Sequence, residues 1–114
     1  MKTHHIAQAI AAVSLSMVFS GVQAAPTYAE VEPILKANAC LACHQVDKKV
    51  IGPAYQDVAA KYKGGDAAVA ATLASHIKNG ISGIWGPVPM PANPRISDAD
   101  LKTVVEWVMS GAPK

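Results

Sequence analysis

The sequence predicts a single small all-α domain of about four helices. No window shows the sustained alternation of apolar and polar residues that a half-buried strand requires. Helix-starting and helix-breaking residues divide the chain into short segments, and no repeat or low-complexity linker suggests a second folded domain. Apolar residues recur at helical spacing, most clearly at Leu101, Val104, Val105 and Val108.

The first 24 residues are organised like a secretory leader. Lys2 supplies a positive charge, an apolar stretch follows, and residues 22–24 provide a site for cleavage before Ala25. A retained membrane anchor is the alternative, but the apolar stretch is shorter than the about 20 residues that span a bilayer. We therefore expect a cleaved signal peptide at 1–24, one mature domain at 25–114, and no stable membrane insertion.

Charge and composition narrow the classes of function. Ten basic residues, one of them Lys2 in the leader, are balanced by eight acidic residues. A nucleic-acid-binding protein would carry a clustered basic face, so we expect no nucleic-acid partner. The mature part holds few aromatic residues, and chains of this size often need a staple or a cofactor to complete the core.

The first helix is expected over residues 28–38, and two signals compete for its start. Thr27 and Glu30 form a capping-box pattern, which starts the helix at residue 28. Proline is favoured at the first helical position, so a start at Pro33 with Glu32 as N-cap is the alternative. The alternatives compete because an interior proline loses a backbone hydrogen bond.

Three further helices follow, separated by recognisable breaks. A short helix is expected near residues 54–62, and a third runs from Asp66 as N-cap to a stop at 79–80. The last helix starts at Ser97, and Gly111 and Pro113 end it. Between the third and last helices, residues 81–96 contain four prolines and two glycines, which predicts a stiff extended loop.

One short motif, Cys40-Leu41-Ala42-Cys43-His44, carries the chemistry. C-x-x-C-H is the attachment pattern of c-type haem. Two thiols separated by two residues can bond to the two vinyl groups of one haem, and the following histidine can then present an imidazole nitrogen to the iron. We expect one covalently bound haem c, attached through Cys40 and Cys43, with His44 as an axial ligand.

Other interpretations of the two cysteines fit the sequence less well. A redox-active C-x-x-C normally belongs to an α/β fold, which the helical pattern does not support. A zinc site needs about four ligands. The mature chain offers only Cys40, Cys43, His44 and His76, and two of these are adjacent. A structural disulfide would leave the histidine unexplained.

The second axial ligand is expected to be a methionine. The mature part holds two, Met90 and Met109. Met109 lies in the last helix just off its apolar stripe, where methionine commonly fills the core. Met90 stands between two prolines in the stiff loop, which suits a held ligand, and methionine ligation raises the reduction potential. The prolines would also hold the loop closed and leave no open position for a substrate.

With these features, the chain resembles the small bacterial class I cytochromes c of the cytochrome c-551 (cytochrome c8) type. The resemblance covers about residues 35–108 and implies the class I cytochrome c fold, with about four helices packed around one haem. Two departures, Pro33 in the first helix and Ala39 before the haem motif, concern helix packing. The matching segments are CLACH at 40–44, IGPAYQDVAAKY at 51–62, HIKNG at 76–80 and IWGPVPMPAN at 84–93.

The resemblance also implies roles around the haem. Pro53 matches the proline whose carbonyl accepts a hydrogen bond from the ligand histidine. Trp85 matches a tryptophan that donates its indole N–H to a haem propionate, and His76 matches an Arg or His position that contacts the same group. Asn93 matches the asparagine that hydrogen-bonds near the sulfur of the methionine ligand.

These expectations converge on a periplasmic monohaem electron carrier rather than an enzyme. Its partners would be redox proteins, such as a reductase, oxidase or peroxidase, that meet a monomer at an exposed haem edge. The alternatives are a peroxidase-like haem enzyme or sensor, which needs a displaceable sixth ligand, and a thiol–disulfide protein. The edge is expected to be ringed by Val50, Ile51, Pro87 and Val88, with Lys48 and Lys49 nearby.

Overall fold

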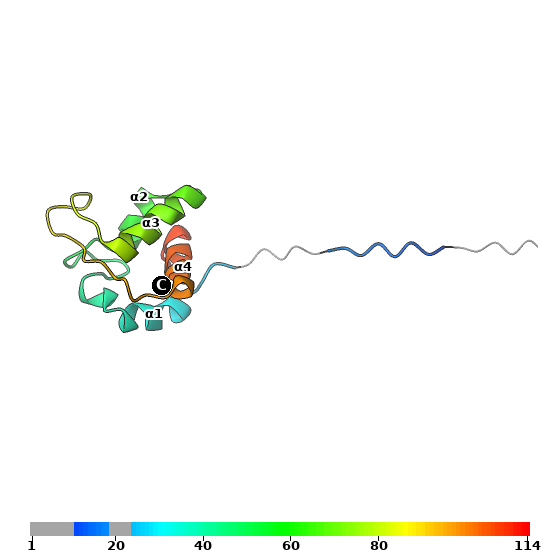
Figure 1. Ribbon diagram of the computed structural model, residues 1–114, viewed down its shortest axis with the longest axis horizontal. Helices are drawn as coiled ribbons and strands as arrows, with labels where there is room; N and C mark the ends of the chain where they lie inside the picture. The colour runs from blue at the N-terminus through cyan, green and yellow to red at the C-terminus, as the bar shows by residue number, and fades with distance from the viewer. Residues whose placement is uncertain (1–10, 19–23) are drawn as a thin grey trace, which may run out of the picture.

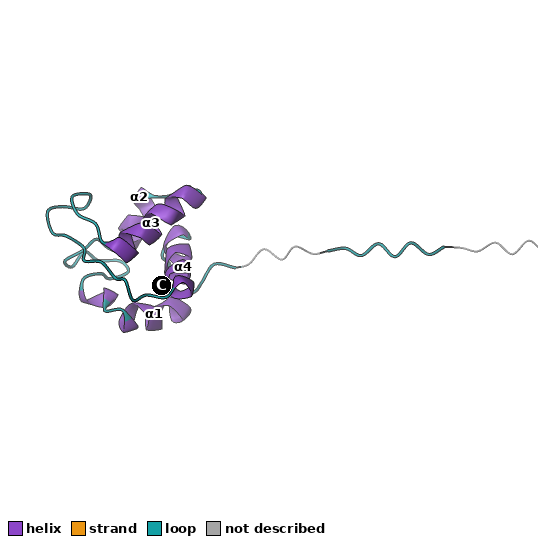
Figure 2. Cartoon of the chain, viewed as in Figure 1, coloured by secondary structure: helices purple, strands orange, loops and turns teal. Residues whose placement is uncertain are grey.

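Four α-helices and one short 3₁₀ helix carry the fold in the computed structural model, which describes residues 11–18 and 24–114 (Figure 1). The described residues contain no β-strand, only two isolated bridges (Figure 2). This confirms the predicted all-α class with about four helices. In chain order the elements are α1 (Tyr28–Ala37), η1 (Cys40–Ala42), α2 (Tyr55–Lys61), α3 (Ala67–Asn79) and α4 (Asp98–Met109).

The leader predicted at 1–24 lies mostly outside the described residues. Of it, the structure describes residues 11–18, which form no regular element, and Ala24. Among the helices of the described ranges, none combines the length and apolar character needed to cross a membrane. The leader therefore stays a prediction.

Helix α1 begins at the earlier of its two predicted starts. Thr27 is the N-cap: its hydroxyl accepts a hydrogen bond from the Glu30 backbone N–H at 3.4 Å. The Glu30 carboxylate in turn accepts from the Thr27 backbone N–H at 2.6 Å, which completes the capping box. Pro33 lies inside the helix, so the alternative start at Pro33 is wrong. Two reciprocal cap bonds offset the one intrahelical bond that proline removes.

Side-chain caps also fix α3 and α4. The Asp66 carboxylate accepts hydrogen bonds from the backbone N–H groups of Ala68 and Val69, at 3.0 and 3.2 Å. The Ser97 hydroxyl accepts from the Asp100 N–H at 3.1 Å. Both N-caps are the residues that the sequence predicts, because Asp and Ser can satisfy first-turn N–H groups that have no partner within the helix.

Helix α4 is central, since it packs against α1, α2 and α3. Its Trp107 is fully buried, and the indole N–H donates to the Pro113 carbonyl at 2.9 Å. The rings of Tyr28 and Tyr55 pack against it, with centroids 5.9 and 5.2 Å away. The predicted stripe of α4 is buried as expected, but Trp107 lies off that stripe and was not predicted as core.

Candidate haem-binding site

A cavity of about 240 Å³ lies between the helices and the loop 81–96. Valines from α4 and residues of α2 and α3 form its inner wall, and the haem-motif segment and the loop lie opposite them. Two of the predicted site residues, Cys40 and Asn93, are not part of its lining. The other six line it: Cys43, His44, Pro53, His76, Trp85 and Met90.

The short helix η1 arranges the haem motif. The N–H groups of Cys43 and His44 both donate to the Cys40 carbonyl, at 3.2 and 2.9 Å, so the motif closes into one tight turn. Ala39, directly before it, takes a left-handed conformation with φ of 56°. Both cysteines are half-buried and unpaired. Burial raises the pKa of the Cys40 thiol, whose Sγ donates to the Asn38 carbonyl at 3.8 Å.

The imidazole of His44 is buried and oriented by a backbone contact. Its Nδ1 lies 2.7 Å from the Pro53 carbonyl oxygen. A carbonyl only accepts, so Nδ1 must carry the proton, and the ring presents Nε2 as its lone-pair nitrogen. The Tyr55 ring stacks on the imidazole at a centroid distance of 5.0 Å. Tyr55 is itself buried, and desolvation raises the pKa of its hydroxyl, which stays neutral.

Gly52 makes this arrangement of His44 sterically feasible. A Cβ built on Gly52 would lie 2.6 Å from His44 Cε1 and 2.9 Å from Nδ1. The ring therefore lies directly against the backbone, close enough to reach the Pro53 carbonyl. The neighbouring chain is held to α2, because the Tyr55 and Gln56 N–H groups donate to the carbonyls of Gln45 and Val46, both at 2.9 Å.

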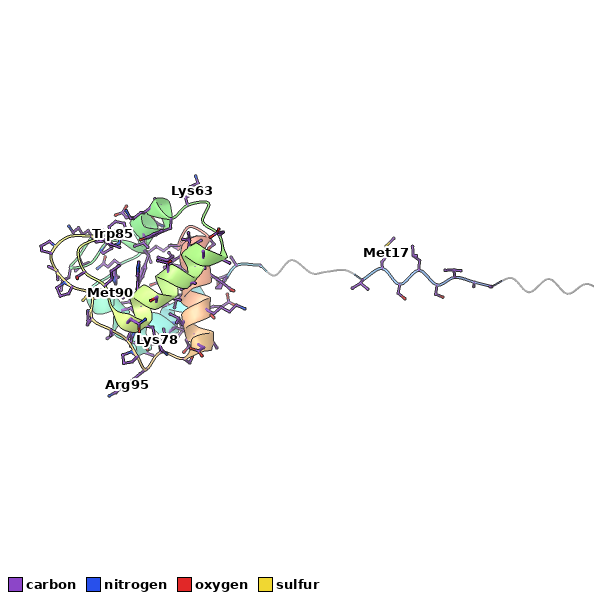
Figure 3. All side chains as sticks on the ribbon, turned by 45° about the horizontal axis from the view of Figure 1, so that its top comes forward. Met17, Lys63, Lys78, Trp85, Met90 and Arg95 are labelled. Carbon is purple, nitrogen blue, oxygen red and sulfur yellow. The ribbon has the colours of Figure 1, made fainter. Side chains whose placement is uncertain are left out.

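Met90 is fixed by its own backbone. Its N–H donates to the Ile81 carbonyl at 2.8 Å, and its carbonyl accepts from the Ile81 N–H at 3.1 Å. Gly80, with φ of 79°, permits this closure, since a Cβ there would lie 2.7 Å from the Met90 oxygen. The loop carries both Met90 and Trp85 (Figure 3). Met109 does not line this cavity and lies instead at a separate pocket between α2 and the end of α4.

The remaining predicted residues surround the cavity in different ways. His76 is half-buried on α3. Trp85 is 38% exposed, and the Lys61 ammonium lies 5.5 Å from its ring centre. Asn93 makes its hydrogen bond through the backbone, donating to the Ile77 carbonyl at 3.0 Å. The contact predicted for its side chain, near the sulfur of Met90, stays a prediction.

The donor set suits a haem better than a bare metal ion. Apart from His44 Nε2 and the thioether of Met90, the wall is built mainly from aliphatic and aromatic side chains. One imidazole and one thioether are a known axial pair for haem iron. Zinc would need a group of three or more His, Cys, Asp or Glu ligands, and none is found in the described part of the chain.

Comparison with known proteins establishes the class. A model of the cytochrome c family matches residues 28–112, so the chain belongs to this family. A cytochrome c-552 from Nitrosomonas europaea is 51% identical over 84 residues, which cover 73% of this chain and 81% of the relative. A cytochrome c-551 from Pseudomonas aeruginosa is 51% identical over 79 residues, covering 69% and 74%. The chain is accordingly an electron-transfer protein rather than an enzyme, and its cofactor is one haem c.

Solved structures agree with this assignment. The crystal structure of wild-type Nitrosomonas europaea cytochrome c552 is 51% identical, with a TM-score of 0.65, and the match covers 69% of this chain and 96% of that one. A class 1 cytochrome, MtoD from Sideroxydans lithotrophicus ES-1, matches at 31% identity with a TM-score of 0.58, covering 70% and 90%. The predicted class I cytochrome c fold is therefore confirmed, and Cys40 and Cys43 are the pair that fits haem attachment.

Sequence reasoning missed three residues that shape the site. Gly52 enters the sequence analysis only as part of the matching segment 51–62, and Gly80 as part of the predicted stop of the third helix. Tyr55 lies in the same matching segment as Gly52, but the sequence predicts no role for it at the site. Their roles depend on which segments approach each other in the fold, and the only local signal was a glycine next to a predicted ligand segment.

Proposed function

We propose that this chain is a periplasmic carrier of single electrons whose haem iron is bound by His44 and Met90. The observation that carries the proposal is that both side chains line one cavity, with His44 turned so that Nε2 is its lone-pair nitrogen. The bound haem supplies the uptake and release of one electron. The protein supplies the axial ligands, a surrounding of low dielectric and an exposed haem edge where partners can bind.

The residues around the two ligands have separate tasks. The Pro53 carbonyl, as acceptor for Nδ1–H, orients His44 and increases the basicity of Nε2. Cys40 and Cys43 hold the haem through thioether bonds. Trp85 and His76 are suited to donate hydrogen bonds to a propionate, since both lie at the cavity.

The proposed location follows from the leader. Removal of residues 1–24 after export would leave the domain 25–114 in the periplasm. The protein would then meet reductases, oxidases or peroxidases as a monomer. Several apolar side chains around the cavity are exposed and suit such encounters: Ile51 at 57%, Val50 at 47% and Val88 at 62%. A small apolar surface edged by Lys48 and Lys49 favours brief, weak complexes.

Exchange of the methionines tests the ligation. Met90→His should remove the far-red absorption band that marks a bond between methionine sulfur and ferric iron. It should also lower the reduction potential, because a harder nitrogen ligand favours ferric iron. Met90→Leu should also remove the band, and Met109→Leu, its matched control, should change neither property. If Met109→Leu removes the band and Met90→Leu retains it, the proposed ligand is wrong.

A further inference from the structure

The loop that carries Met90 is attached to the end of α3 at more than the Ile81 bridge. After Met90 the chain passes the last turn of α3 on its way to α4. The Asn93 N–H donates to the Ile77 carbonyl at 3.0 Å, and the Lys78 ammonium donates to the Ile96 carbonyl at 2.7 Å. The returning part of the loop, residues 90–96, is therefore bonded to the last turn of α3 by one backbone group and one side chain.

Lys78 is the charged member of this attachment. Its side chain is 35% exposed, so its bond to the carbonyl is partly shielded from water. Hydrogen bonds from an ionised donor are stronger than those between neutral groups. Its second contact, to Asp98 at 3.9 Å, involves a fully exposed carboxylate, and ion pairs of that kind contribute little. The contact with the Ile96 carbonyl is therefore the contact through which Lys78 attaches the loop to α3.

The composition of residues 90–96 lets a contact at Ile96 act on Met90. Pro91 and Pro94 lie between the two residues and restrict the backbone. Ile96 is buried, with 2% of its surface exposed, so the far end of this segment has little freedom. A flexible segment would absorb a displacement at Ile96, whereas a stiff one transmits part of it to Met90.

We propose that Lys78 is a positioning residue for the axial methionine: its hydrogen bond to the Ile96 carbonyl holds residues 90–96 against α3 and keeps Met90 at the cavity. The inference rests on the proposed ligation by Met90. Lys78 is not among the residues that line the cavity, so its effect on Met90 passes through the loop. In Figure 3, Lys78 lies near the end of α3, close to the loop that bears Met90.

The test measures how readily an added ligand displaces Met90 from ferric iron. In the holoprotein, Lys78→Met keeps the aliphatic stem and removes the charged donor. Free imidazole should then bind the ferric form about tenfold more tightly, because a hydrogen bond to a charged group contributes at least a factor of that size. The far-red band should also disappear at a lower temperature than the helical circular dichroism signal. Lys78→Arg should restore both properties.

Lys102→Met is the matched control. Lys102 pairs with Glu106 on the exposed side of α4, and its side chain is 74% exposed. This variant should bind imidazole like the unmodified protein, and so should Asp98→Asn. If Lys78→Met and Lys102→Met bind imidazole equally, or if band and helix signal are lost together, the role of Lys78 is refuted. Lys78→Gln serves the same test if Lys78→Met does not accumulate as holoprotein. An unmodified protein without the far-red band would instead refute ligation by Met90.

Discussion

Ala39 adopts a backbone conformation that alanine tolerates poorly, and replacing it should stabilise the protein. Its φ of 56° lies in the left-handed region, which costs a residue with a Cβ about 1–2 kcal/mol. Glycine avoids that cost, but it lowers the free energy of unfolding by about 0.4–1 kcal/mol because the unfolded chain gains entropy. The Ala39 side chain is exposed, so little packing is lost. The free energy of unfolding of Ala39→Gly should rise by about 0.5–1 kcal/mol.

Thermal and denaturant unfolding of the oxidised holoprotein would measure this change. For a domain of this size the predicted gain corresponds to a rise in Tm of roughly 3–6 °C. Ala71→Gly is the matched control, because Ala71 is exposed in the middle of α3. Glycine there should lower the free energy of unfolding by about 1 kcal/mol. The same chemical change should thus have opposite signs at the two sites. The reasoning fails if Ala39→Gly lowers the Tm as Ala71→Gly does.

Two further substitutions separate the site from the core. Gly52→Ala should lower the free energy of unfolding of the holoprotein by about 1–3 kcal/mol, as measured in denaturant. The new Cβ would overlap the His44 ring and disturb its bond to the Pro53 carbonyl. Unchanged stability would show that the ring has room to move. Trp107→Phe should lower the free energy of unfolding by about 2 kcal/mol, through lost volume and the lost bond to the Pro113 carbonyl. The visible spectrum should not change, since Trp107 does not line the cavity. An altered spectrum would contradict this separation of core and site.

Local signals account for the parts of the fold that were predicted well. Helix α3 begins after Asp66 and ends at Asn79, as the sequence indicated, because its N-cap carboxylate and the positive φ of Gly80 act within a few residues. The capping box of Thr27 and Glu30 likewise fixes the start of α1. The presence of four helices followed from similar signals and from the apolar spacing of α4.

What escaped prediction depends on distant segments meeting. Nothing near Gly52 in the sequence shows that the His44 ring will lie against it. Trp107 lies off the stripe of α4 and becomes core because Tyr28 of α1, Tyr55 of α2 and the segment after α4 cover it. The bond from Lys78 to the Ile96 carbonyl joins a helix end to a loop whose path no periodicity describes. These contacts arise from the tertiary packing.

The dependence of the whole fold on α4 has a consequence for the order of events during maturation. Helices α1, α2 and α3 all pack on this last helix, and the contact of α1 with α4 joins opposite ends of the domain (Figure 1). Contacts between residues far apart in the chain form late, because a long loop must close first. Before α4 has formed, the other three helices lack the helix against which they pack. The turn Cys40–Ala42 packs on α1, so we expect this turn to reach its final packing only when α1 and the last helix have docked.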